Sequence, residues 1–307
     1  MKTTMKTMVT GRGAVPRCGA RGRTRSALHH LRVRAASKEA APSSQAANTL
    51  PMMPSDRYVA MNRFRVQDRA EADAKFEKRW AERPSRLATM DGFRWFALFR
   101  RINLDGTDLT EEQNEDFNYT SMTLWQDQPT FQVWREGDAF KEAHGGGNIK
   151  GILDMLISSA QTLKGKPKLL LANAYATQSL EVSESDLLKM AGGWRSVVAD
   201  GKRVLDPECF MCAVDYVVEP GREAAFLQEA SASISESRGA GGFRFGTVLN
   251  ADAGKGADAD VFTLSTVWDT KEQWEASRAG EAELGEARKT ETRFFEGKLV
   301  LTTQKGA

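Results

Sequence analysis

The feature that most constrains this chain of 307 residues is an internal repeat. Two segments, 58–177 and 207–305, carry the same succession of patterns. Each begins with an apolar strand and a helix, continues with a strand that opens on Gly-Phe-Arg and one that ends on Trp, and closes with a helix and a strand. Two residue pairs anchor the correspondence: Gly92 with Gly242, and Trp125 with Trp268. The sequence therefore predicts two copies of one βαββαβ unit.

The expected elements can be placed along both segments. In the first segment they are a strand over 58–66, a helix carrying Ala72, Phe76 and Trp80, a strand from Gly92 to Phe99, a strand ending at Trp125, a helix capped by Asp127 that runs from near Pro129 through Phe140, and a strand over 168–176. In the second they are a strand over 210–218, a helix with Phe226, strands at Gly242 and before Trp268, a helix from about Lys271, and a strand over 293–302. Residues 178–206 connect the segments and are expected to include a short helix from Asp186 to Ala199.

A βαββαβ unit folds as four antiparallel strands with both helices on one face, which leaves the other sheet face bare. Two units that pack sheet on sheet bury both bare faces, as an obligate homodimer of single domains would. We therefore predict an α+β fold in which tandem ferredoxin-like domains form a dimeric α+β barrel within one chain. Such a chain is expected to be a monomer with an internal pseudo-dimer.

Residues 1–48 differ in composition from the rest of the chain. They contain many arginines, including Arg32 and Arg34, and no carboxylate before Glu39. This composition is typical of an organelle transit peptide, and the stretch 32–37 resembles an algal chloroplast cleavage region. We therefore predict import into the chloroplast stroma. The alternative is a basic arm that binds nucleic acid, but nothing in the remaining sequence supports nucleic-acid binding.

The remaining chain has the composition of a soluble globular protein, with 41% hydrophobic and 27% charged residues overall. The longest apolar runs, such as residues 169–172, are far shorter than the roughly 20 residues needed to span a bilayer. We therefore expect no transmembrane helix and no membrane partner.

Cys209 and Cys212 are spaced as Cys-x-x-Cys inside an apolar run that is typical of a strand. A thioredoxin-type motif needs its first cysteine at the start of a helix, and a zinc site needs a second pair of ligands that the sequence lacks. Residues three apart on a strand point to opposite faces. We therefore expect two structural thiols rather than a redox pair.

Removal of the predicted transit peptide would take His29 and His30 with it, so that His144 would be the only histidine left. Any axial imidazole ligand would then have to be His144, which is followed by Gly145–Gly147. Glycines there would stop the helix and let the backbone approach a flat ligand. The alternative reading is a histidine placed favourably at a helix C-terminus.

The first segment resembles the IsdG-type haem oxygenases of the antibiotic-biosynthesis-monooxygenase superfamily. Three features carry the resemblance: Asn62-Arg63 in the first strand, Thr123-Leu124-Trp125 at the end of the third, and the helix sequence over 131–144. The family's active site is an Asn, a Trp and a His, with the Trp ten residues before the His. The resemblance therefore implies a site of Asn62, Trp134 and His144, and no catalytic role for Trp125.

The implied roles suit these residue types. His144 would be the proximal ligand of the haem iron. Ten helical residues span about 15 Å, comparable to the width of a porphyrin, so Trp134 could press on the ring while His144 holds the iron. Asn62 could donate its amide hydrogens to oxygen on the distal side. Taken singly, Trp134 could equally be a core residue, and Asn62 an ordinary polar residue of a strand.

The second segment lacks this pattern. Val214 stands at the position of Asn62, Ser277 at that of Trp134, and Ala287 or Arg288 at that of His144. We therefore expect the second domain to be a packing partner without a productive haem site.

The resemblance implies an enzyme that binds one haem, opens the porphyrin with dioxygen and releases iron. The sequence has no flavin or nicotinamide motif, because the glycines after His144 follow a helix rather than a strand. Electrons would have to come from an external donor such as ascorbate or a ferredoxin. Three alternatives remain: a haem-independent oxygenase of quinols or phenols, a haem carrier or sensor that leaves haem intact, and a purely structural barrel.

Overall fold

The protein is described from a computed structural model that places residues 52–82, 87, 90–113, 116–143, 159–179, 209–251, 260–277, 284–285 and 287–302. The predicted transit peptide at 1–48, the predicted helix at 186–199, and His144 lie outside these residues. The same holds for nearly all of the predicted connector at 178–206.

The described strands and helices follow the predicted order. The first half comprises β1 (Arg57–Phe64), α1 (Ala70–Glu82), β2 (Phe93–Ile102), β3 (Tyr119–Trp125), α2 (Gln128–Glu136), α3 (Asp138–Ala143) and β4 (Lys168–Ser179). The second half comprises β5 (Phe210–Val217), α7 (Glu223–Arg238), β6 (Phe243–Ala251), β7 (Val261–Trp268), α8 (Lys271–Ser277) and β8 (Arg288–Thr302). The predicted α+β class is confirmed.

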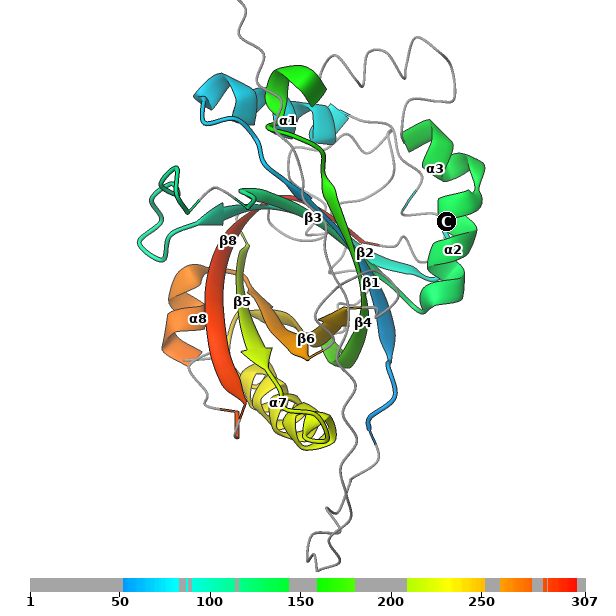
Figure 1. Ribbon diagram of the computed structural model, residues 1–307, viewed down its shortest axis with the longest axis vertical. Coiled ribbons are helices and arrows are strands. Elements are labelled where there is room, and N and C mark those ends of the chain that lie inside the picture. Colours follow the sequence, from blue (N-terminus) through cyan, green and yellow to red (C-terminus); the bar gives the residue numbers. More distant parts are fainter. Residues whose placement is uncertain are drawn as a thin grey trace, which may run out of the picture. The chain divides into compact units, whose positions relative to one another are not determined.

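The eight strands form one closed barrel in the order β1-β3-β2-β8-β5-β7-β6-β4, and all neighbouring strands are antiparallel. The first half contributes the run β4-β1-β3-β2 and the second half the equivalent run β8-β5-β7-β6. The two runs join through hydrogen bonds between β2 and β8 and between β4 and β6. The helices lie outside this ring of strands (Figure 1). The halves therefore share one continuous sheet.

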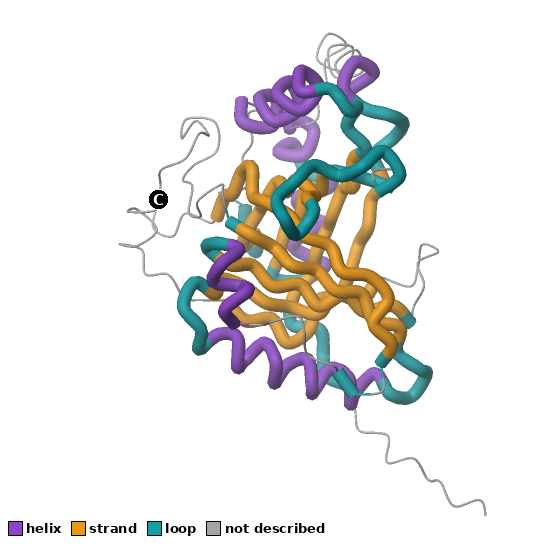
Figure 2. Tube along the Cα trace, turned by 90° about the vertical axis from the view of Figure 1, so that its left-hand side faces the viewer, coloured by secondary structure: helices purple, strands orange, loops and turns teal. Residues whose placement is uncertain are grey.

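Apolar side chains form one layer inside the barrel and two layers outside it. The interior layer mixes residues of both halves, including Trp95 and Phe245, whose stacked rings lie 5.4 Å apart. One outer layer packs under α1 and α2, and the other under α7 and α8. Figure 2 shows the long helix α7 running across the outside of the strands. Within the described part of the chain, no helix has the length and apolar character that a membrane crossing requires.

Cys209 and Cys212 occupy different layers, as predicted for residues three apart on a strand. Cys209 belongs to the barrel interior, whereas Cys212 belongs to the layer under α7 and α8. Both side chains are buried and they form no disulfide with each other. Burial raises the pKa of the Cys212 thiol to about 12, so this thiol stays protonated at neutral pH and is a poor nucleophile.

Asp127 caps α2 as predicted, because its carboxylate accepts a hydrogen bond from the backbone N–H of Thr130 at 2.9 Å. The prediction that this helix continues through Phe140 is wrong. Helix α2 ends at Glu136, where Gly137 takes an extended conformation and its N–H bonds to the carbonyl of Trp134, and α3 begins at Asp138. Glycine weakens a helix interior. Asp138, the residue after Gly137, is an acidic residue in the first turn of the new helix α3, where a negative charge is favourable. The estimate of ten continuous helical residues from Trp134 therefore does not hold.

Gly92 and Gly242 have no side chain where the first turn of α2 and of α8 comes close to the backbone at the start of the following strand. Both residues have positive φ, +74° and +85°. A Cβ atom on Gly92 would lie 2.5 Å from Thr130, in the first turn of α2, and one on Gly242 would collide with Gln273 in the first turn of α8. The two glycines of the repeat therefore have the same structural role.

Replacing Gly92 with alanine is expected to destabilise the fold for two reasons. A left-handed backbone costs a residue with a Cβ about 1–2 kcal/mol, and overpacking against Thr130 adds about 1–3 kcal/mol. Gly106 is the matched control, because its φ is +81° but a Cβ there meets nothing within 4 Å. Urea unfolding should show a larger loss for Gly92→Ala than for Gly106→Ala. Equal losses in the free energy of unfolding would mean that the close contact with Thr130 does not contribute to the destabilisation.

Candidate active site

A cavity of about 160 Å³ lies in the first half between the outer face of the sheet and helices α1, α2 and α3. Strand residues form its floor: Ala60, Asn62, Phe96, Ser121, Thr123 and Leu169. Its remaining wall consists of Trp80, Leu87, Phe131, Trp134, Arg135 and Phe140. The lining is thus mainly apolar and rich in aromatic rings, with four polar or charged residues. This composition is typical of a site for a small organic ligand.

Trp134 is held firmly in this wall by other aromatic side chains. Its ring centroid lies 5.4 Å from that of Trp125, 5.9 Å from that of Phe131 and 5.0 Å from that of Phe140, the last in an edge-to-face arrangement. Such pairs add about 0.5–1.5 kcal/mol each beyond their buried area. The indole is therefore a rigid surface against which a flat molecule can pack.

Trp80 forms a second flat surface of the cavity. Its ring stacks on that of Phe96 with centroids 5.6 Å apart and an interplanar angle of 26°. In the sequence, Trp80 carries only the spacing of a core residue on α1, so no motif marked it as part of a site. The fold adds it to the site because the end of α1 and strand β2 meet beside the cavity.

Two polar residues of the cavity, Thr123 and Asn62, differ in whether their side chains already form hydrogen bonds within the protein. The hydroxyl of Thr123 donates to the carbonyl of Ala60 at 3.0 Å. No hydrogen bond within the described part of the chain engages the amide of Asn62, which is half-buried in β1. Asn62 therefore keeps two N–H donors and one carbonyl acceptor for a ligand.

The structure brings two of the three predicted site residues together. Asn62 from β1 and Trp134 from α2 line the same cavity. His144 follows the last residue of α3 in the chain but lies outside the described residues. The volume of about 160 Å³ is smaller than the roughly 300–1,000 Å³ of a typical ligand pocket. A large ligand would therefore require the cavity to widen.

The strand registers show which residues of the two halves correspond. Trp125 pairs with Tyr58 in the first half, and Trp268 pairs with Phe210 in the second. Counted from these pairs, Asn62 and its partner Ser121 correspond to Val214 and its partner Leu264.

The second half fills the space that the first half leaves open. Val214 and Leu264 are buried in the layer under α7 and α8 and are apolar, unlike their counterparts Asn62 and Ser121. Phe294, which pairs with Cys212, packs edge-to-face on Trp274 of α8 with ring centroids 5.3 Å apart. Apolar side chains thus replace the two polar floor residues Asn62 and Ser121.

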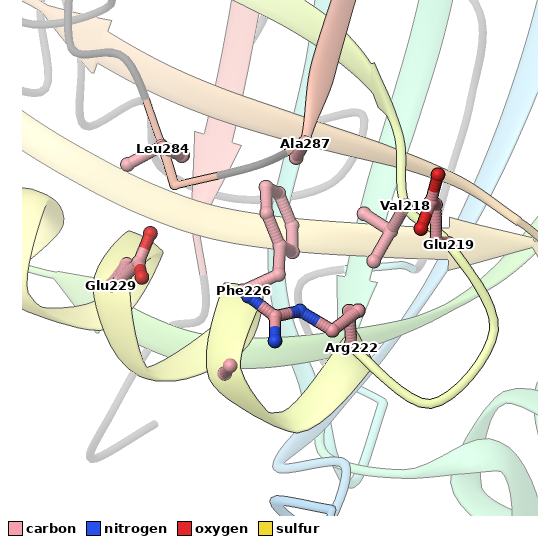
Figure 3. A pocket seen from close by; sticks show the side chains of 8 residues that line it. Val218, Glu219, Arg222, Phe226, Glu229, Leu284 and Ala287 are labelled. Carbon is pink, nitrogen blue, oxygen red and sulfur yellow. The ribbon is translucent and has the colours of Figure 1, made fainter. Parts of the chain in front are cut away.

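A cavity of about 20 Å³ remains beside α7 in the second half. Figure 3 shows the Phe226 ring of α7 reaching toward Ala287, between Val218 and Leu284. A volume of this size holds about one water molecule. This space is therefore too small for an organic substrate.

A second hollow near the seam between the halves, about 640 Å³ and open, is lined by charged residues of α1, β2, β8 and the segment after β2. Most of these charges already have partners. Arg100 donates to Glu296 at 2.6 Å, Lys298 lies 2.8 Å from the same carboxylate, and the hydroxyl of Tyr119 donates to Glu77 at 2.7 Å. The charges of this hollow, here called the charged groove, are therefore largely balanced by neighbouring side chains of the protein. No sequence motif predicted a site there.

Residues 57–146, which span β1 to α3 and include His144, match the family model described as antibiotic biosynthesis monooxygenase. No protein of curated function matches the chain. The crystal structure of a candidate monooxygenase from Fusobacterium nucleatum subsp. nucleatum ATCC 25586 is similar, with a TM-score of 0.50 and 9% identity over 84% of this chain and 97% of the other. This likeness confirms the fold.

Two further solved structures resemble the chain more distantly. A candidate monooxygenase from Lactobacillus acidophilus NCFM shares 7% identity with a TM-score of 0.47, over 80% of this chain and 96% of the other. An anthrone oxidase-like protein shares 13% identity with a TM-score of 0.45, over 81% of this chain and 94% of the other.

Asp73 of α1, which lines the charged groove, makes the stability of the protein depend on pH. Burial raises the pKa of its carboxyl group from 3.8 to about 6, although Arg100 lies 4.0 Å away and opposes the shift. The folded state therefore binds this proton more tightly than the unfolded state does. Stability falls as the pH rises from about 4 to 6 and stays reduced above that range.

Asp73→Asn is expected to stabilise the protein at pH 7 by about 1–3 kcal/mol, because one pKa unit corresponds to about 1.4 kcal/mol. The gain should shrink as the pH falls below 6 and disappear near pH 3, below both the ordinary pKa of 3.8 and the raised value of about 6, where Asp73 is protonated in both states. Thermal unfolding of both proteins between pH 3 and 8 measures this difference. A gain that is the same at every pH would show that charge burial is not its cause.

Proposed function

We propose that the first half of the chain is a haem-degrading monooxygenase and that the aromatic cavity is its active site. The observation that carries the proposal is that Asn62 and Trp134 line one cavity, although 72 positions separate them in the chain. The match of residues 57–146 to a monooxygenase family supports an enzyme of this general type. The choice of haem rests on the residue set Asn62, Trp134 and His144.

The residues present suit a porphyrin in kind. Trp134 and Trp80 provide flat apolar surfaces for a macrocycle, and Asn62 provides an amide without a hydrogen-bond partner in the described part of the chain. His144, one position after α3, would hold the iron. When bound, haem supplies the redox-active iron and the ring carbon that is oxidised.

The side chains of the cavity have separate tasks in this reaction. Trp134, braced by Trp125, Phe131 and Phe140, sets the position of the ring against the sheet. Asn62 donates an amide hydrogen toward the oxidant from the floor of the cavity. The aromatic walls exclude water from the reacting carbon, which limits side reactions.

Electrons come from an external donor such as ascorbate or a ferredoxin, and the protein works in the chloroplast stroma after loss of residues 1–48. The second half takes the place of the second subunit of a dimeric barrel, as an internal pseudo-dimer in a monomeric chain. The filled layer at Val214 and Leu264 supports a scaffolding role for that half.

A smaller phenol or quinol, oxidised without haem, is the second candidate substrate. The volume of about 160 Å³ favours it, because such a molecule fits the cavity as described and a porphyrin does not. The two candidates differ in their need for His144, since only haem uses an axial imidazole.

Haem titration followed by absorbance tests the proposed function. The protein should show a saturable Soret band, and His144→Ala should weaken binding at least ten-fold, because it removes the axial ligand. Addition of ascorbate in air should then bleach the band and release iron. A band that persists under reductant would identify a haem carrier. Absence of a band, with phenol or quinol oxidation that does not depend on His144, would establish the second candidate.

Ser121→Leu tests whether the cavity is the binding site. The substitution places in the first half the leucine that the second half has at the corresponding position, Leu264. The added side chain should fill the floor and abolish the Soret band, while circular dichroism stays unchanged. Ser121→Ala is the control, because it removes the hydroxyl without filling space and should still bind. Normal binding by Ser121→Leu would place the ligand elsewhere.

A further inference from the structure

Arg135 is the one cationic side chain among the twelve residues that line the aromatic cavity. It follows Trp134 in the last turn of α2 and is half-buried. No carboxylate forms an ion pair with it within the described part of the chain. By contrast, Arg100 and Arg101 of β2, which line the charged groove, have acidic partners at 2.6 and 2.9 Å. Its guanidinium group is thus a charge beside a ligand cavity, with no counter-ion among the residues that the structure describes.

The acidic residues nearest to Arg135 in the chain are engaged with other side chains. Glu136 accepts a hydrogen bond from Gln132 at 2.6 Å, and Asp138 pairs with Lys141 at 3.0 Å. A basic residue in the last turn of a helix also interacts favourably with the helix dipole, by about 0.3–1 kcal/mol at the surface. That interaction explains a cation at the end of α2 but not its position on the cavity wall.

We propose that Arg135 binds a carboxylate of the substrate and that the site therefore selects flat aromatic molecules that carry a carboxylate group. This inference rests on the proposed function, because it names a substrate feature for the same cavity. The guanidinium presents paired N–H donors whose geometry matches a carboxylate. The stacked rings of the wall hold the aromatic body, and Arg135 fixes which edge of it points toward α2.

The test compares haem, which carries two carboxylates, with haem dimethyl ester, in which both are blocked. Arg135→Leu should weaken haem binding about ten-fold, equivalent to about 1.4 kcal/mol, and leave the affinity for the ester unchanged. Arg135→Lys should recover part of the loss, because it restores the charge but not the paired donors. Arg238→Leu is the matched control, since Arg238 is an exposed arginine in the last turn of α7. It should bind both ligands like the unaltered protein.

The outcomes separate this inference from the proposed function. If haem binds but Arg135→Leu weakens haem and the ester equally, the inference is wrong and the haem site stands. If the protein binds no haem, the proposed function is wrong, and fluorescence titration with 9-anthroate and neutral 9-anthracenemethanol decides the inference. A preference for 9-anthroate that Arg135→Leu abolishes supports it. No such preference overturns it.

Discussion

The pairing of sheet edges between the two halves is the interaction on which the rest of the structure depends. Each half alone is a four-stranded sheet with two unpaired edges and one uncovered face, which is an aggregation hazard. The β2–β8 and β4–β6 ladders remove those edges, and the inner faces meet in a shared core. Trp95 of one half stacks on Phe245 of the other inside the barrel. Closure thus leaves the outer faces as the surfaces that helices cover.

The two outer layers show how one scaffold supports different local chemistry. Both halves set the second helix of the repeat in the same way, with a positive-φ glycine against its first turn and a side-chain cap at its start. The difference lies in the strand residues below that helix. Asn62 and Ser121 leave a cavity with unused polar capacity, whereas Val214 and Leu264 fill the same level with apolar atoms. A few side chains on a frame that both halves share therefore decide which half can hold a ligand.

Much of the frame and part of the candidate site could be predicted from the sequence. Trp125 and Trp268 marked equivalent strand ends, Asp127 marked a helix start, and Asn62 and Trp134 were expected in one site, where the cavity brings them together. The continuous helix beyond Gly137 was wrong, because apolar periodicity continues across a break that the backbone makes at a single glycine. Trp80 and Arg135 were missed, because a tryptophan with core spacing and an arginine on a helix carry no signal of a ligand.

The sequence by itself determined the βαββαβ repeat, because strand and helix periodicity, turn glycines and capping residues are local properties that each segment expresses alone. It also determined the asymmetry of the halves, since the replacement of Asn62 by Val214 and of Trp134 by Ser277 can be seen in the repeat. Only the tertiary structure decided how the edges pair and which side chains share the cavity. Those depend on strand register and helix placement, which bring together residues far apart in the chain and which no local pattern encodes.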